Sequence, residues 1–186
     1  MDVCEKLKGL GENYSALIVT PISLLKDELL HVVRKATGTG LPILLLTLNK
    51  PQEALDEQFR AEGIDTSKIL YVDCIAKSLG TVTRKKNVIH IEHASDLTSI
   101  NIAVSEFIEK IKTEKFIIID ALATLLIYNS EDMVVKFVRS VVQSARGSRL
   151  ICFTPSAKGL SFIEKISVYF DEVVDLSAEE NASQSR

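Results

Sequence analysis

Seven short apolar segments rich in β-branched residues alternate with longer segments whose apolar residues recur at helical spacing. Several of the short segments are apolar throughout, which is typical of strands covered on both faces. The alternation predicts successive β–α–β units, and hence an α/β fold of three layers, α/β/α, around a mostly parallel sheet. The expected strands are 16–20, 43–47, 69–72, 88–91, 116–119, 150–154 and 173–176.

Helices are expected between these strands. Apolar residues from 22 to 36 trace one helix face that ends at Gly38, and Pro51 is expected in the first turn of a helix that ends before Gly63. Asp96 is a predicted N-cap, and Ser130 or Glu131 begins the next helix. A short helix is expected in 161–170.

The 186 residues fit one domain, which we place at 1–177, followed by a small polar tail at 178–186 that we expect to be disordered. No apolar run approaches the roughly 20 residues that a membrane span requires. The start lacks the basic segment and apolar stretch of a secretory signal, so we expect a cytoplasmic protein.

Charge and cysteine content exclude several function classes. The net charge of -3 gives no electrostatic reason for nucleic-acid binding, and the basic run Arg84, Lys85 and Lys86 is short and without aromatic neighbours. Three widely spaced cysteines argue against a disulfide framework and provide no zinc-type pair. Buried, unreactive thiols are the simpler interpretation.

The order and spacing of several segments resemble the RecA-like ATPase core, in detail the KaiC and RadA-type branch found in many archaeal proteins. The likeness covers roughly residues 14–176. Each segment alone is weakly specific, and together they indicate the P-loop NTPase-like fold but not the activity. They are 17–21, 40–48, 53–65, 116–126, 137–142, 151–154 and 171–176.

The resemblance implies a phosphate-binding loop, G-x-x-x-x-G-K-S/T, after the first strand. That pattern places Thr20 and Leu25 at its glycines, Lys26 at its lysine and Asp27 at its hydroxyl, so only the lysine matches. The glycines let backbone N–H groups approach phosphate oxygens, and Leu24 and Leu25 are expected to fill that space. Asp27 adds negative charge beside a polyanion. We therefore expect a degenerate Walker A motif and no cofactor, with ATP and Mg²⁺ disfavoured.

A simpler account of the same residues needs no lost motif. Thr20 caps the helix, Pro21 occupies its first position, and the chain passes directly from strand to helix. Lys26 is then a solvated lysine.

The resemblance also implies roles for residues at two other strand ends. Asp120 matches the Walker B-type aspartate that supports magnesium in active relatives, although a carboxylate there can simply cap the next segment. The catalytic glutamate of the KaiC-like branch normally follows the second strand, where this chain has Asn49 and Lys50. Neither can act as a carboxylate base. We therefore expect an inactive ATPase homologue and not an enzyme.

Two other kinds of site are disfavoured. His90 and His93 lie at the end of a predicted strand, where residues three apart point to opposite faces, so no metal site is expected. A receiver-type phosphorylation domain would use Asp120 and Lys158, but it also needs an acidic pair after the first strand, where Thr20 and Pro21 stand.

Two functional hypotheses remain. The first is a non-catalytic binding or regulatory module that associates with itself or with an active relative, a homo-oligomer being slightly favoured. The alternative is a protein that binds a nucleotide or another anionic ligand in an altered way at the C-terminal edge of the sheet. The candidate rim residues at that edge are Lys26, Asn49, Lys50, Asp120 and Lys158.

Overall fold

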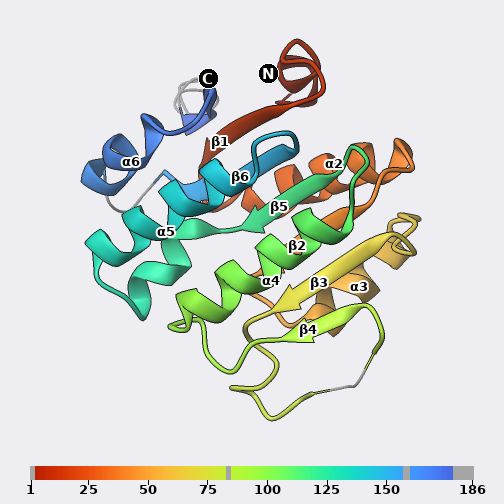
Figure 1. Cartoon of the computed structure of the whole chain (residues 1–186). Coiled ribbons are helices and arrows are strands. Elements are labelled where there is room, and N and C mark those ends of the chain that lie inside the picture. The colour runs from red at the N-terminus through yellow and green to blue at the C-terminus, as the bar shows by residue number, and fades with distance from the viewer. Residues whose placement is uncertain (1–2, 83–84, 157–159, 178–186) are drawn as a thin grey trace.

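The computed structural model describes residues 3–82, 85–156 and 160–177. Within them a seven-stranded sheet forms the centre of the domain, in the order β4-β3-β2-β5-β6-β1-β7 (Figure 1). Every neighbouring pair is parallel, which confirms the predicted α/β fold with a parallel central sheet. Arg84, Lys158 and the predicted tail 178–186 lie outside the described residues. The strands are β1 (Tyr14–Thr20), β2 (Ile43–Thr47), β3 (Ile69–Asp73), β4 (Val88–His90), β5 (Phe116–Asp120), β6 (Arg149–Pro155) and β7 (Glu172–Asp175).

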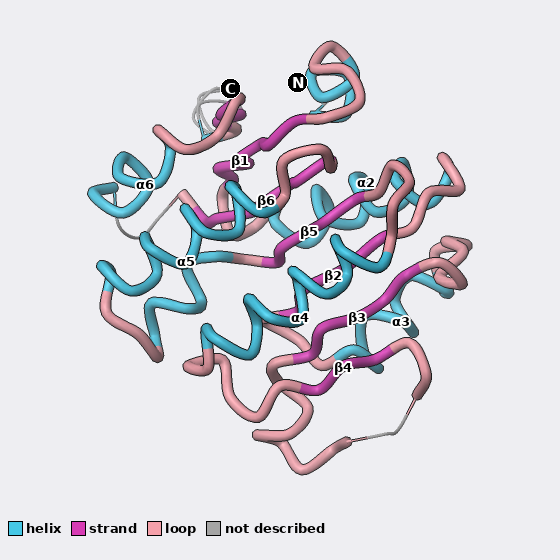
Figure 2. Tube along the Cα trace, in the orientation of Figure 1, coloured by secondary structure: helices cyan, strands magenta, loops and turns pink. Residues whose placement is uncertain are grey.

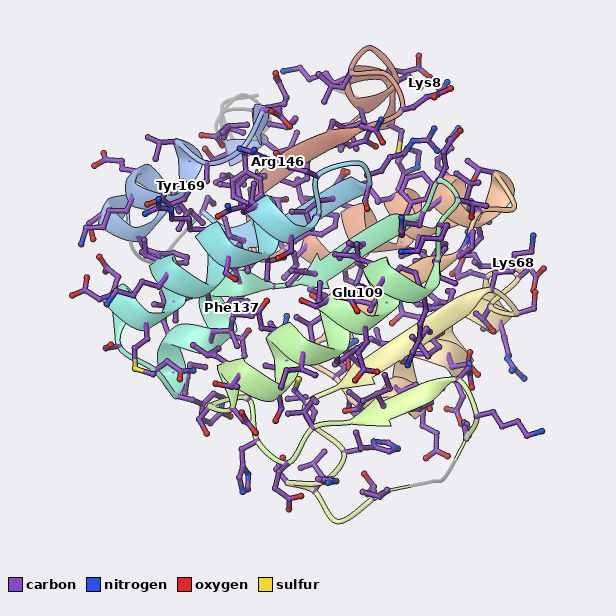
Figure 3. The ribbon with its side chains drawn as sticks, in the orientation of Figure 1. Lys8, Lys68, Glu109, Phe137, Arg146 and Tyr169 are labelled. Atoms are coloured by element: carbon purple, nitrogen blue, oxygen red, sulfur yellow. The ribbon has the colours of Figure 1, made fainter. Side chains whose placement is uncertain are left out.

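Helices cover both faces of the sheet. In Figure 1, α4 and α5 lie in front of the sheet and α2 and α3 behind it, and Figure 2 shows the same layers as cyan coils around magenta strands. Phe137 on α5 and Glu109 on α4 mark the front layer in Figure 3. The helices are α1 (Val3–Lys8), α2 (Leu25–Gly38), α3 (Gln52–Ala61), α4 (Leu97–Lys110), the 3₁₀ helix η1 (Leu122–Ile127), α5 (Glu131–Ser144) and α6 (Leu160–Ser167).

The sheet separates two apolar cores because successive strand residues point to opposite faces. In β2, Leu44 and Leu46 join the core beneath α4, α5, α6 and η1. Ile43 and Leu45 join the core beneath α1, α2 and α3. Both faces of the central strands are therefore buried, which is why their sequences show no alternation of apolar and polar residues. Cys4, Cys74 and Cys152 are buried free thiols, as expected.

The junction between β1 and α2 differs from the sequence-based expectation. The N-cap of α2 is Leu24, and no side chain caps the helix. Thr20 is fully buried at the end of β1. The Pro21 carbonyl accepts hydrogen bonds from the N–H groups of Leu24 (3.0 Å) and Leu25 (3.1 Å), so one turn separates strand and helix. The prediction that Thr20 caps the helix and Pro21 begins it is therefore wrong. By contrast, Asp96 caps α4 as predicted, since its side chain accepts from the Ser99 N–H at 2.9 Å.

The chain changes direction across the sheet between β2 and β5. These strands are hydrogen-bonded neighbours, with Thr47 paired to Asp120 at their C-terminal ends. From β2 the chain continues through α3 to β3 on one side, and from β5 it continues through η1 and α5 to β6 on the other. The connections therefore leave toward opposite faces, and an open parallel sheet typically binds ligands at such a switch point.

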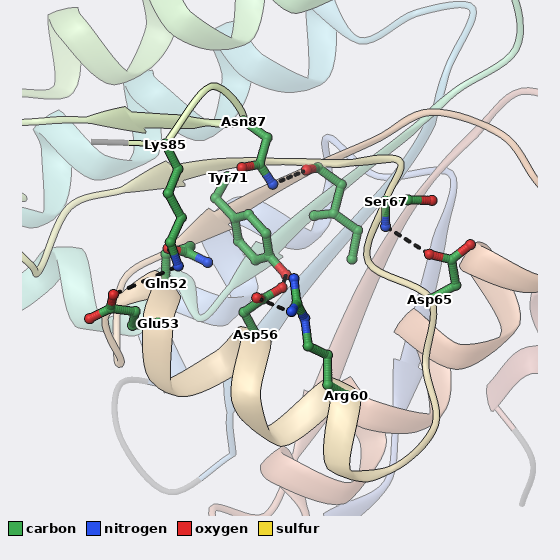
Figure 4. Close-up of polar contacts among 10 residues, drawn as sticks. Gln52, Glu53, Asp56, Arg60, Asp65, Ser67, Tyr71, Lys85 and Asn87 are labelled. Carbon is green, nitrogen blue, oxygen red and sulfur yellow. Dashed lines mark hydrogen bonds and ion pairs between the residues drawn. The ribbon is translucent and has the colours of Figure 1, made fainter. Parts of the chain in front are cut away.

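Polar contacts hold α3 against β3 (Figure 4). The Tyr71 hydroxyl donates to Asp56 at 3.1 Å, and Arg60 pairs with the same carboxylate at 3.1 Å. Asn87 donates to the Ile69 carbonyl at 3.2 Å, joining the segment before β4 to β3. Since α3 directly follows β2, these contacts also hold the loop at the end of β2 in place.

Asp73, at the end of β3, caps the surrounding backbone. Its carboxylate accepts hydrogen bonds from the N–H groups of Gln52 (2.6 Å), Ile75 (2.8 Å) and Ala76 (2.9 Å). The side chain is fully buried. It therefore joins the start of α3 to the segment that follows β3.

We predict that Asp73→Ala destabilises the protein strongly. Three backbone N–H groups lose their acceptor, and an unsatisfied buried donor costs about 1–3 kcal/mol, so the free energy of unfolding should fall by roughly 3 kcal/mol or more. Urea denaturation measures the change. The matched control is Asp132→Ala, at an exposed position of α5, where a much smaller loss is expected. Equal stability of the two variants would contradict the prediction.

Candidate functional site

A cavity of about 720 Å³ lies at the C-terminal edge of the sheet, at the switch point between β2 and β5. Its wall is formed by α2, α3, η1, the loop after β2 and the end of β6. We call it the switch-point cavity. Most of its lining side chains are apolar: Ile22, Leu25, Leu29, Leu55, Ala123, Leu126, Ile127 and Pro155. The polar ones are Lys26, Asn49, Lys50, Gln58, Asp120 and Thr124.

Four residues proposed from the sequence meet in this cavity: Lys26, Asn49, Lys50 and Asp120. They lie at or just after the C-terminal ends of three different strands, and parallel strands bring those ends to one edge. Two other candidates do not line it. Thr20 is buried, with its hydroxyl 3.5 Å from the Pro21 carbonyl, and Asp27 is exposed on α2. Lys158 lies outside the described residues.

The segment 20–27 forms a turn and a helix start instead of a glycine-rich cradle. It contains no glycine, and no described non-glycine residue has a positive φ angle. The backbone angles that only glycine adopts readily are therefore absent from this segment. Leu25 lines an open cavity at this edge of the sheet, whereas Leu24 does not line it.

A polar chain of side chains connects η1 to the end of β5. The Thr124 hydroxyl donates to the Asn49 side-chain oxygen, and Asn49 Nδ2 donates to Asp120 Oδ1 at 3.0 Å. Asn49 therefore joins the loop after β2 to the segment after β5. The peptide bond between Asp120 and Ala121 is cis.

The surroundings of Asp120 differ from those of a capping aspartate. Asp73 accepts three backbone hydrogen bonds, whereas Asp120 accepts one hydrogen bond from the described residues, from the Asn49 side chain. Its interpretation as a cap of the next segment is therefore wrong for the described residues. The side chain is only 3% exposed. Burial raises the pKa of Asp120 to about 6, while the Asn49 hydrogen bond and the positive charge of Lys50 limit the rise.

The two lysines of the cavity are exposed. Lys26 comes from the first turn of α2 and Lys50 from the loop after β2, and neither forms an ion pair with a described residue. In the described part of the chain, no cluster of three or more histidine, cysteine or acidic side chains could hold a metal ion. The cavity thus combines apolar walls with one buried carboxylate, an arrangement suited to binding.

Sequence reasoning missed the apolar wall and Thr124. The wall depends largely on η1, which forms where the sequence shows only the apolar run 121–127 after Asp120. That run was a usable signal, because six of the seven residues that follow the strand-end carboxylate are apolar and such a run is expected to pack against another element. Its partner could not be read from periodicity, since 3₁₀ segments are short and lack a helical apolar stripe.

Solved structures with the same fold define the class of this domain. A KaiC-like protein, PH0186, from the hyperthermophilic archaeon Pyrococcus horikoshii OT3 has a TM-score of 0.61 and 14% identity, over 89% of this chain and 73% of that one. An uncharacterized protein, PH0321, from Pyrococcus horikoshii, solved in complex with an unknown peptide, has a TM-score of 0.71 and 14% identity, over 92% of this chain and 82% of that one. The seven-stranded parallel sheet and its helices thus form a KaiC-like, RecA-type α/β fold.

The family is given by the sequence. Residues 27–176 match the family described as "Family of unknown function (DUF7504)", and the chain belongs to that family. No curated protein matches the sequence. Among the described residues, no helix has both the length and the apolar character to cross a membrane.

Asp120→Asn is predicted to stabilise the protein at neutral pH. The pKa of Asp120 rises from 3.8 to about 6 on folding, so between those values the folded state holds its proton more tightly than the unfolded state does. The free energy of unfolding should therefore fall as pH rises from about 4 to 6. At about 1.4 kcal/mol per pH unit, removing the charge should add roughly 2–3 kcal/mol at pH 7 and nothing at pH 4. Thermal and urea unfolding across pH measure this.

The control for this experiment is Asp27→Asn. Asp27 is an exposed carboxylate in the first turn of α2, where negative charge is favourable, so its removal should bring no gain at pH 7. A loss of stability in Asp120→Asn at neutral pH would show that the ionised carboxylate holds the fold together.

Proposed function

We propose that this protein is a non-catalytic KaiC-like domain that acts as a binding module, and that its switch-point cavity receives an apolar segment of a protein partner. The observation that carries the proposal is the cavity itself, which lies where open α/β sheets bind ligands but has mainly apolar walls. A triphosphate site needs donors and cations directed at its oxygens. Apolar walls instead favour aliphatic side chains.

We propose that the domain is non-catalytic because its sequence departs from the motifs of active ATPases at separate positions. Leu25 and Asp27 stand where the phosphate loop would have a glycine and a hydroxyl, which we interpret as a degenerate Walker A motif. Asn49 and Lys50 stand where a catalytic glutamate would follow the second strand. Asn49 is, in addition, held by Thr124 and Asp120, so that its amide serves a structural contact.

A protein partner is supported by the residues around the cavity. Ile22, in the turn before α2, and Ile127, at the end of η1, both line the cavity. They are 71% and 73% exposed, respectively. Large apolar side chains grouped at a cavity commonly mark interaction sites. A solved structure of the same fold contains an unknown peptide, which is consistent with peptide binding by such domains.

Nucleotide binding gives the first test. We predict no change in melting temperature with ATP or ADP, with or without Mg²⁺, because the segment after β1 contains no glycine and no positive φ angle that a phosphate loop would need. A ligand at 100 times its dissociation constant would add about 2.7 kcal/mol of stability. A shift that disappears in Lys26→Ala, or ATP hydrolysis that depends on Lys26, would overturn the proposal and favour nucleotide binding at the same edge.

Peptide binding gives the second test. A peptide array rich in apolar residues, measured by fluorescence anisotropy, should yield peptides that bind the wild-type protein. We expect Ile127→Asp to weaken that binding tenfold or more, since about 1.4 kcal/mol of lost apolar contact changes affinity by that factor. The matched control is Ile102→Asp, a 54% exposed isoleucine on α4 and away from the cavity, which should bind normally. Equal weakening in both variants would contradict the placement of the site.

A further inference from the structure

We infer that the partner segment presents a basic side chain, lysine or arginine, beside its apolar residues, and that Asp120 at the end of β5 binds this cation inside the switch-point cavity. The inference rests on the proposed function, because it requires a peptide in the cavity. It adds the chemistry that selects the peptide. Nothing in the fold class or in the family description assigns this role to Asp120.

Asp120 has unused capacity to accept hydrogen bonds. Its Oδ1 atom accepts from Asn49 Nδ2 at 3.0 Å, and the side chain receives no second hydrogen bond from a described residue. An ionised carboxylate has about four acceptor positions. At 3% exposure, water reaches few of them. A donor from a ligand would fill this deficit.

The structural contact that Asp120 makes does not require a carboxylate. Asp73 lies at the end of β3, on the opposite side of β2 from Asp120. It is equally buried but accepts hydrogen bonds from three backbone N–H groups. Asp120 holds only an amide side chain, which an asparagine or a serine could also hold. A buried charge is costly unless it is paired, so its presence in an apolar cavity points to a partner from outside the chain.

The lining of the cavity suits a long basic side chain. Lysine and arginine carry aliphatic stems that pack on apolar surfaces while the charged head finds a polar partner. Leu29, Leu55 and Leu126 provide such a surface in the same cavity as Asp120. A charge-assisted hydrogen bond in this setting is about twice as strong as a neutral one. The volume of about 720 Å³ leaves room for neighbouring apolar side chains of the peptide.

The two lysines that line the cavity repel a cation bound at Asp120 only weakly. Among the described lining residues, α2 contributes Lys26 and the loop after β2 contributes Lys50, while α3, η1 and the end of β6 contribute no charged group. Both lysines are exposed, so water and salt screen them more than they screen Asp120. Lys50 is the nearer competitor, since its charge acts on Asp120. Removing Lys50 should therefore favour a basic ligand.

The test uses peptide pairs that differ in one charge. Peptides that place arginine beside leucines are compared with copies in which citrulline, a neutral side chain of nearly the same shape, replaces the arginine, and with glutamate copies. By anisotropy at pH 7.5, the wild-type protein should bind the arginine peptide about tenfold more tightly than the citrulline peptide. Asp120→Asn should lose this preference to within about twofold, and Lys50→Gln should bind the arginine peptide more tightly than the wild type does.

The pH profile and a control variant separate recognition of charge from a merely structural role. Binding of the arginine peptide should weaken as pH falls below about 6, because Asp120 then becomes protonated, whereas binding of the citrulline peptide should not change. Asp27→Asn should behave as the wild type. Thermal unfolding confirms that Asp120→Asn is folded.

The possible results distinguish the two proposals. Equal affinity for arginine and citrulline peptides, or preference for the glutamate peptide with weakening in Lys50→Gln, overturns the role of Asp120 and leaves the apolar binding site intact. If none of the peptides binds to the wild-type protein, the proposed function and this inference are both contradicted.

Discussion

The pairing of β2 with β5 is the constraint on which the site depends. Thr47 and Asp120 are neighbours at the ends of these strands, but the chain leaves the two ends toward opposite faces of the sheet. Backbone that leaves in opposite directions cannot close the space above the strand ends. The strands hold this geometry rigidly because both of their faces are buried in separate apolar cores. The cavity is therefore a property of the topology, and the side chains decide only what it accepts.

Two buried aspartates at this edge, at the ends of the strands on either side of β2, illustrate how environment sets the role of a residue. Asp73 is surrounded by backbone N–H groups, which stabilise its charge and make it part of the scaffold. Asp120 meets one amide and mainly apolar neighbours, so its charged form is destabilised by burial. Natural proteins tolerate such a cost mainly where a group is used for binding or chemistry. Because the segment after β1 also contains no glycine, we interpret the Asp120 carboxylate as a binding group.

Much of the fold could be predicted from local sequence patterns. The strands follow from β-branched apolar runs, and Asp96 is recognisable as a cap because a short acidic side chain precedes an apolar helical stripe. The start of α2 could not be predicted, since it depends on the Pro21 carbonyl accepting two hydrogen bonds and not on a capping side chain. The helix Val3–Lys8 and η1 were missed because segments of six residues are too short to show a helical period.

The sequence by itself determined that Lys26, Asn49, Lys50 and Asp120 lie near one another, because parallel strands place all their C-terminal ends at one edge. It also determined that the glycines of a phosphate loop are missing. Only the tertiary structure decided that this edge contains an open apolar cavity and that Asp120 is buried within it. The reason is that the cavity forms between α2, α3 and η1, whose contacts join residues far apart in the chain and leave no periodic pattern in the sequence.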